Sequence, residues 1–193
     1  MSEKIKWGME KVLKGKYVIK PGANLSCATL WRADLRGEDL RKADFQQADL
    51  EEADLEGADL REANLRLAKL QGARLQGANL ERAYLLGVDF DGADLEKANL
   101  RNTCLRNASL QGTRFQGAKL QGARLCDSYL WGADLSYASL HGANFEGTHL
   151  NGADLRGARL NQETNLTDAD LTDAKIRGMQ VEGPDGEIYT VGE

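Results

Sequence analysis

The feature that most constrains this chain is a strict five-residue period of large apolar side chains. A leucine or phenylalanine occupies every fifth position from Leu25 to Leu160, which gives 28 such positions in succession. The residue two positions earlier is small, and in 22 of the 28 cases it is alanine. After Leu160 one additional residue enters, and the period resumes at Leu166, Leu171 and Ile176. Most of the chain is therefore one short unit repeated many times.

This period excludes an amphipathic α-helix, although the abundant Ala, Leu, Glu, Lys and Arg favour helix by propensity. Five residues advance about 500° around an α-helix, so successive leucines would be displaced by about 140°. No apolar stripe could form on such a helix, and a period of five does not match the heptad of a coiled coil.

The same spacing fits a short strand followed by a corner. The small and the large residue are two apart, so they point to the same side of a strand, and the residue between them points outward. The next two residues are usually polar or glycine, which favours a turn. One such side cannot bury its apolar surface alone, so a stack of coils about 4.8 Å apart is the expected stable unit.

The repeated motif A(D/N)LxX, as in Ala53-Asp54-Leu55-Glu56-Gly57, resembles the pentapeptide-repeat family. The resemblance covers about residues 23–178 and is to the loop-free, cyanobacterial type. It implies four sides per 20-residue coil, a right-handed path, and between seven and eight coils. The expected fold class is therefore all-β, a right-handed quadrilateral β-helix.

Three segments are predicted: 1–22 as an N-terminal capping helix and lead-in strand, 23–178 as the β-helix, and 179–193 as a C-terminal capping hairpin or tail. In the leader, helical spacing with a possible N-cap and a glycine stop favours a helix, on the residues Ser2, Ile5, Met9, Val12, Leu13 and Gly15. A short strand is expected at 17–19. The tail predicts a hairpin around residues 183–186, with Val181, Ile188 and Val191 covering the last coil.

One repeat departs from the pattern, because Glu38 occupies an inward position. A buried carboxylate without a partner would cost several kcal/mol. The first coil is therefore expected to be partly open, with Glu38 meeting a lysine of the leader or water.

Composition excludes several classes of protein. A formal net charge of −5 is mild and does not favour a nucleic-acid binder or a strongly acidic mimic of DNA. No apolar run approaches the roughly 20 residues that span a bilayer, and the N-terminus lacks a signal-peptide core, so the expected location is cytoplasmic. Cys27, Cys104 and Cys126 have no CxxC spacing and are predicted to be free thiols.

Nothing in the sequence indicates catalysis. The repeats fill their own core, so no small-molecule pocket is expected. His141 and His149 fall on different sides and lack metal-ligand spacing, and the glycines recur at corners instead of forming a phosphate loop. The chain is predicted to be no enzyme and to hold no cofactor and no metal.

Function is therefore expected in the deviations from the repeat. The first is a candidate interaction surface of apolar residues at outward positions. If the coil has four sides, five of these residues share one side: Leu67, Tyr84, Leu86, Cys104 and Cys126. The other two, Tyr129 and Trp131, lie on the next side. Contiguous exposed apolar residues often mark an interface, although tolerated surface substitutions would give the same pattern.

The second deviation is banded charge. A candidate acidic band comprises Asp49, Glu51, Glu52, Asp54, Glu56 and Asp59. Residues 97–126 hold six bases and no acid, a basic band of Lys97, Arg101, Arg106, Arg114, Lys119 and Arg124. Stacking 20 residues apart places Asp34 over Asp54, which is a like-charge contact that Arg36 over Glu56 is expected to offset in part. The bands fit either an electrostatic docking surface or an ordinary solvated face.

The predicted function is a non-catalytic structural or protein-interaction scaffold whose partner is another protein. The family resemblance implies an alternative, a DNA mimic that binds a type II topoisomerase in the manner of quinolone-resistance proteins. A second alternative is a regulator in cyanobacterial differentiation signalling. Direct nucleic-acid binding and a membrane span are not expected.

Overall fold

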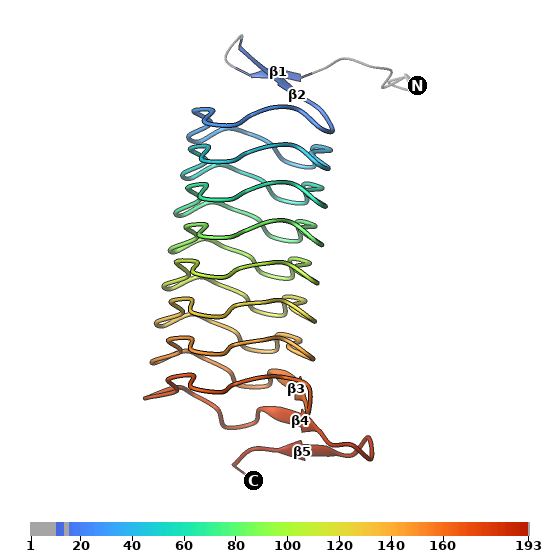
Figure 1. Ribbon diagram of the computed structural model, residues 1–193, viewed down its shortest axis with the longest axis vertical. Coiled ribbons are helices and arrows are strands. Elements are labelled where there is room, and N and C mark those ends of the chain that lie inside the picture. Colours follow the sequence, from blue (N-terminus) through green and yellow to red (C-terminus); the bar gives the residue numbers. More distant parts are fainter. Residues whose placement is uncertain (1–10, 14–15, 193) are drawn as a thin grey trace, which may run out of the picture.

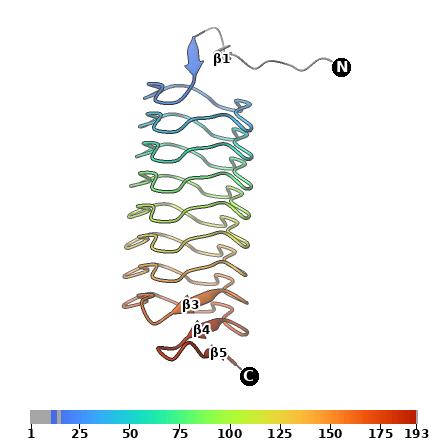
Figure 2. The same cartoon turned by 90° about the vertical axis from the view of Figure 1, so that its right-hand side faces the viewer.

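The computed structural model describes residues 11–13 and 16–192. The chain winds into a stack of similar coils along one long axis, with the described N-terminal residues at one end and the C-terminal residues at the other (Figure 1). The view turned by 90° shows the same regular stack (Figure 2). The expected β-helical solenoid is confirmed, and no helix occurs among the described residues.

Each coil contains four pentapeptides. Isolated parallel bridges join residues 20 apart, from Asn24 with Asp44 to Ser139 with Arg159. After the additional residue beyond Leu160 the offset becomes 21, as in Asn144 with Asn165. We name the four sides after their first large residue: the Leu25, Leu30, Leu35 and Leu40 sides.

Backbone hydrogen bonds run in both directions between neighbouring coils. The N–H of Leu25 donates to the carbonyl of Asp44 at 2.7 Å, and the N–H of Asp44 donates to the carbonyl of Ala23 at 2.8 Å. At the corner, the N–H of Ala28 donates to the carbonyl of Leu25 at 3.1 Å and closes a turn. This pattern repeats along the stack, so the backbone polar groups of the sides are paired, although the strands in the described part of the chain are only three residues long.

The core is a column of inward side chains. The large residues from Leu25 to Leu160 are 0–4% exposed, and most of the small residues beside them are equally buried. Four inward positions carry a hydroxyl residue instead of alanine. These residues are Thr103, Thr113, Ser128 and Thr148. Each hydroxyl donates to a backbone carbonyl at 2.6–2.8 Å, so none of them adds an unpaired polar group to the core.

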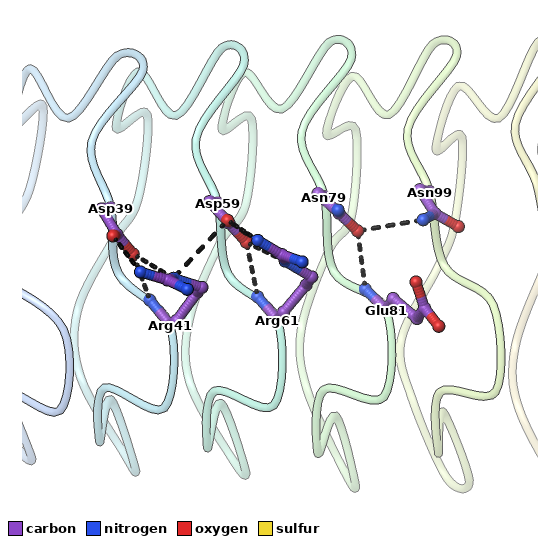
Figure 3. Close-up of polar contacts among 7 residues, drawn as sticks. All are labelled: Asp39, Arg41, Asp59, Arg61, Asn79, Glu81 and Asn99. Atoms are coloured by element: carbon purple, nitrogen blue, oxygen red, sulfur yellow. Dashed lines mark hydrogen bonds and ion pairs between the residues drawn. The ribbon is translucent and has the colours of Figure 1, made fainter.

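The Asp or Asn of the motif points outward, but its side chain also accepts a backbone hydrogen bond from the following turn. The carboxylate of Asp39 accepts the backbone N–H of Arg41 at 3.3 Å, and the side-chain oxygen of Asn79 accepts that of Glu81 at 3.2 Å (Figure 3). The same bond recurs on all four sides. Asp and Asn are therefore favoured because a short side-chain acceptor satisfies the first N–H of the turn.

At the N-terminal end the predicted helix is wrong where the structure describes it. Strand β1 (Lys11–Leu13) pairs antiparallel with β2 (Tyr17–Ile19). Of these two strands, only β2 was expected from the sequence. Pairing with β2 satisfies the backbone of residues 11–13, which outweighs their helical spacing. The other helix residues, Ser2 to Met9 and Gly15, lie outside the described residues. Glu38 is partly exposed, consistent with a coil that is open at that point.

The C-terminal hairpin is present. Strand β3 (Arg159–Asn161) pairs in parallel with β4 (Gln180–Glu182), which pairs antiparallel with β5 (Ile188–Thr190). Val181 packs against the core, but Ile188 is 56% exposed and does not cover the last coil, which corrects the expectation. Strand β5 continues the ladder of β3 and β4 by pairing with the outer edge of β4, and the side chains of both Ile188 and Tyr189 are more than half exposed there. The division at residues 22 and 178 stays a prediction.

The corners of the repeat place their last residue at positive φ, whether or not that residue is glycine, with the exception of the corner after Leu160. At Gly57, where φ is +65°, an added Cβ would meet nothing within 4 Å. Gly57→Ala is therefore expected to lower the free energy of unfolding by about 1 kcal/mol through backbone strain alone. Urea denaturation measures the change.

The control for this substitution is the reverse change, Arg82→Gly, at a corner with φ of 58°. This change removes the same strain and should leave the urea midpoint equal or higher. A stability of Gly57→Ala equal to that of the parent protein would contradict the strain account.

Candidate functional site

The structure brings five of the predicted interface residues together on the Leu25 side. We call Leu67, Tyr84, Leu86, Cys104 and Cys126 the Tyr84 patch. Tyr84 forms a parallel bridge with Cys104, and the N–H of Leu67 donates to the carbonyl of Leu86 at 3.1 Å. The side chains of Leu67, Tyr84 and Leu86 are 53%, 48% and 40% exposed, whereas both cysteines are half-buried.

The patch is packed, not a set of isolated side chains. The guanidinium carbon of Arg66 lies 5.1 Å from the centroid of the Tyr84 ring, within the range of a cation–π contact. The side chain of Leu67 lies over the backbone of the next coil, because a Cβ added at Gly87 would come within 2.8 Å of its Cδ2. Apolar side chains with a guanidinium at their edge therefore lie side by side on neighbouring coils of the Leu25 side.

Tyr129 and Trp131 lie on the Leu30 side with a third ring that the sequence interpretation did not include. The ring of His149 stacks on that of Tyr129 at 5.1 Å with 2° between the planes, and Trp131 lies edge-on to both. His149 lies one coil after Tyr129, so the 20-residue offset identifies it as a neighbour of that ring. Metal-ligand spacing, the property for which the two histidines were compared above, does not reveal this contact.

Below His149 the column continues with Asp170, which is its bridge partner. The Asp170 carboxylate accepts the hydroxyl of Thr172 at 2.6 Å, the backbone N–H of Thr172 at 3.0 Å and the amide of Asn151 at 2.6 Å. These bonds, led by the Thr172 hydroxyl, lower the pKa of Asp170 to about 2, and His149 contributes a smaller part. The carboxylate is a fixed acceptor at this end of the Leu30 side.

The acidic band surrounds much of one coil, from Asp49 and Glu51 on the Leu30 side to Asp59 on the Leu40 side. Most of its carboxylates have basic partners on the same or an adjacent coil. The ion pairs are Arg32–Glu52 at 2.7 Å, Arg74–Asp54 at 3.4 Å, Arg74–Glu56 at 3.3 Å and Arg61–Asp59 at 2.6 Å. The band is therefore largely neutralised within the molecule.

The predicted like-charge stacking is present, because Asp34 forms a bridge with Asp54. The compensating contact differs from the one expected. Arg36 lies 2.9 Å from the Asp34 carboxylate and 3.7 Å from that of Asp54, instead of over Glu56. One guanidinium can reach both members of a stacked carboxylate pair, which explains the difference. On the Leu40 side the guanidinium of Arg41 spans two stacked carboxylates in the same way (Figure 3).

The basic band is only partly paired. Arg114 lies 2.6 Å from the carboxylate of Asp94 and Lys97 lies 2.7 Å from that of Glu96. Among the residues that the structure describes, no carboxylate lies within 4.0 Å of Arg101, Lys119 or Arg124. The unpaired cations of the band thus include one on the Leu25 side, at Arg124.

Within residues 11–13 and 16–192, no group of three or more His, Cys, Asp or Glu side chains is placed to hold a metal ion. A small apolar cavity of about 50 Å³ lies at the C-terminal end of the core, lined by Leu140, Phe145, Leu150, Leu155, Leu160, Leu166, Leu171, Ile176 and Met179. Its lining offers no polar side chain to orient a ligand. No described helix is long and apolar enough to cross a bilayer.

Comparison with known proteins agrees with this geometry. The family model for pentapeptide repeats matches residues 23–61, 63–102, 94–132 and 127–162, and the chain belongs to the pentapeptide-repeat family. No curated protein matches the sequence.

Two solved structures illustrate the similarity. A trypsin-treated form of QnrB1, a plasmid-mediated fluoroquinolone resistance protein, has a TM-score of 0.50 at 20% identity, over 76% of this chain and 85% of that one. HetL, a pentapeptide repeat protein involved in heterocyst differentiation regulation in the cyanobacterium Nostoc, is 33% identical over 88% of this chain and 86% of its own, with a TM-score of 0.31.

The lowered pKa of Asp170 predicts a loss of stability in acid. Its carboxylate is stabilised in the folded state, so the contribution is complete above the unfolded pKa of about 4 and is lost as pH falls toward 2. Asp170→Asn should flatten the decline of the urea midpoint between pH 5 and pH 2. Asp168→Asn, at a corner whose side chain makes no hydrogen bond with described residues, is the control and should keep the slope of the parent. Equal slopes for both variants would contradict the assignment.

Proposed function

We propose that this protein is a non-catalytic interaction scaffold and that a partner protein docks on the Tyr84 patch. The observation that carries the proposal is the exposure of Leu67, Tyr84 and Leu86 at outward positions that in most other repeats hold a polar residue or glycine. Side chains of this kind are costly to leave in water and often lie in interfaces. The aromatic cluster of Tyr129, Trp131 and His149 extends the candidate surface around the corner.

The rest of the molecule is consistent with a scaffold. Pentapeptide-repeat proteins are typically structural or interaction proteins, and the inward positions of this chain are filled by its own side chains. The three cysteines are free thiols, which favours a reducing compartment, and we place the protein in the cytoplasm. Because HetL acts in the regulation of heterocyst differentiation, a role in cyanobacterial differentiation is a more specific form of this proposal.

The proposal predicts that Tyr84→Asp/Leu86→Asp abolishes capture of partner proteins from a lysate of the native host. Two charges in the middle of the patch would oppose the desolvation of any apolar partner surface. The matched control is Trp31→Asp/Tyr137→Asp, which changes two exposed aromatic residues outside the patch. Mass spectrometry of the captured proteins provides the comparison. Recovery of the same proteins with both variants would remove the Tyr84 patch from consideration.

The alternative, a DNA mimic that binds a type II topoisomerase, has less support. A mimic needs unpaired surface carboxylates, whereas Glu52, Asp54, Glu56 and Asp59 have arginine partners. Similarity to QnrB1 at 20% identity concerns the fold.

A gyrase supercoiling assay with a quinolone tests the mimic directly. We expect micromolar protein to leave both the supercoiling rate and the drug inhibition unchanged. Protection of gyrase from the drug, lost on Asp54→Asn/Glu56→Gln, would favour the mimic instead.

A further inference from the structure

We propose that the Tyr84 patch recognises an acidic segment of its partner that also carries apolar or aromatic side chains. This inference rests on the proposed function and specifies the chemistry of the partner. The observation behind it is that the apolar side chains of the patch alternate with arginines, most of which have no carboxylate within 4.0 Å among the described residues.

The alternation follows from two columns on the Leu25 side. One column contains Asn64, Tyr84, Cys104 and Arg124 in successive coils, joined by parallel bridges. A second column lies two residues later in each pentapeptide, at the first residue of the corner. It contains Arg66, Leu86, Arg106 and Cys126, also 20 residues apart. Arginine therefore lies at both ends of Leu86, and Arg124 follows Cys104 in the Tyr84 column. Arg82 precedes Tyr84 at the corner, so guanidinium groups surround the apolar residues on several sides.

The four arginines, Arg66, Arg82, Arg106 and Arg124, form what we call the basic rim. All four are exposed. Within the described part of the chain, Arg66, Arg82 and Arg124 have no carboxylate within 4.0 Å, and Arg106 has a long contact of 3.9 Å with Asp127. The carboxylates nearest the C-terminal end of the rim are those of Asp127 and Glu146, which line one surface hollow with Arg106 and Arg124.

Several arginines on other sides of the molecule are paired with carboxylates of the chain itself. On the Leu35 and Leu40 sides, guanidinium groups lie 2.6–2.9 Å from carboxylates, as for Arg36, Arg61 and Arg156. The chain as a whole has a formal charge of −5, so carboxylates are not scarce. The basic rim differs from the other unpaired bases in that its positive charge borders an exposed apolar surface.

A ligand for this surface must supply both kinds of contact. Carboxylates would form charge-assisted hydrogen bonds with the guanidinium groups, and these bonds become stronger when an apolar neighbour excludes water. Apolar side chains would cover Leu67, Tyr84 and Leu86. The patch extends over four coils, so its first and last rungs are about 14 Å apart at the strand spacing, which matches four or five extended residues or about ten residues of helix.

The test uses a defined probe, a fluorescently labelled random copolymer of glutamate and tyrosine in a ratio of four to one. Fluorescence polarisation should show binding that weakens as salt is raised, because surface charge is screened. Polyglutamate of equal length should bind at least fivefold more weakly, since it lacks apolar side chains. Oligothymidylate of equal charge should also bind at least fivefold more weakly than the copolymer.

Two variants separate the two kinds of contact. Tyr84→Ser/Leu86→Ser should weaken copolymer binding at least fivefold while leaving polyglutamate binding unchanged. Arg82→Gln/Arg124→Gln should weaken both polymers at least fivefold and reduce the salt dependence. The matched control is Arg159→Gln/Arg177→Gln, which removes the same charge at the C-terminal end and should bind like the parent. Equal urea midpoints establish that each variant is folded.

Several outcomes overturn the inference. These are no copolymer binding, equal binding of copolymer and polyglutamate, equal loss with the control variant, and tighter binding of oligothymidylate, which would indicate a nucleic-acid surface. Capture of partners from the host lysate distinguishes failure of the acidic-segment inference from failure of the scaffold proposal. If Arg82→Gln/Arg124→Gln retains partners that Tyr84→Asp/Leu86→Asp loses, the scaffold proposal is supported. The inference that the partner segment is acidic is then contradicted. Loss of the same partners with both supports the inference.

Discussion

The structure depends on one geometric constraint, the backbone ladder that joins each residue to the residue 20 positions later. Because both the N–H and the carbonyl groups of a side are used in this ladder, neighbouring coils cannot slide past one another without breaking many bonds. The buried leucines and phenylalanines then stack in register, and burial of this apolar column supplies the main driving force. Every outward side chain consequently acquires two fixed neighbours, and the surface chemistry follows from that arrangement.

The fold could be predicted from the sequence because inward positions accept few residue types. A five-residue period with alanine before leucine identifies the sides, and the 20-residue offset then places Tyr84 beside Cys104. Side-chain conformations could not be predicted in this way. The period does not reveal that Arg36 spans Asp34 and Asp54, because a long flexible side chain can reach several partners. The N-terminal strand was also missed, since the pairing of Val12 with Val18 is a tertiary contact that local helical spacing does not report.

The aspartates illustrate why surface charge is a poor guide to function in this fold. Asp39 and Asp59 accept the N–H groups of their turns and also pair with arginines, and these contacts lower the pKa of both carboxylates. The acidity of the repeat is in large part a requirement of its corners. Positions that lack this dual role, such as Tyr84 and Arg124 in the same column, are freer to reflect selection for binding. Deviations from the motif are therefore more informative than its net charge.

The contact between Leu67 and Gly87 has a consequence for how such a surface can evolve. The Leu67 side chain occupies the space that a Cβ at residue 87 would need. Substitutions at these two corners are therefore not independent, although 20 residues separate them: a side chain at residue 87 is compatible only with a smaller or repositioned one at residue 67. In a solenoid of this kind, non-additive effects of surface substitutions should therefore recur between residues one coil apart.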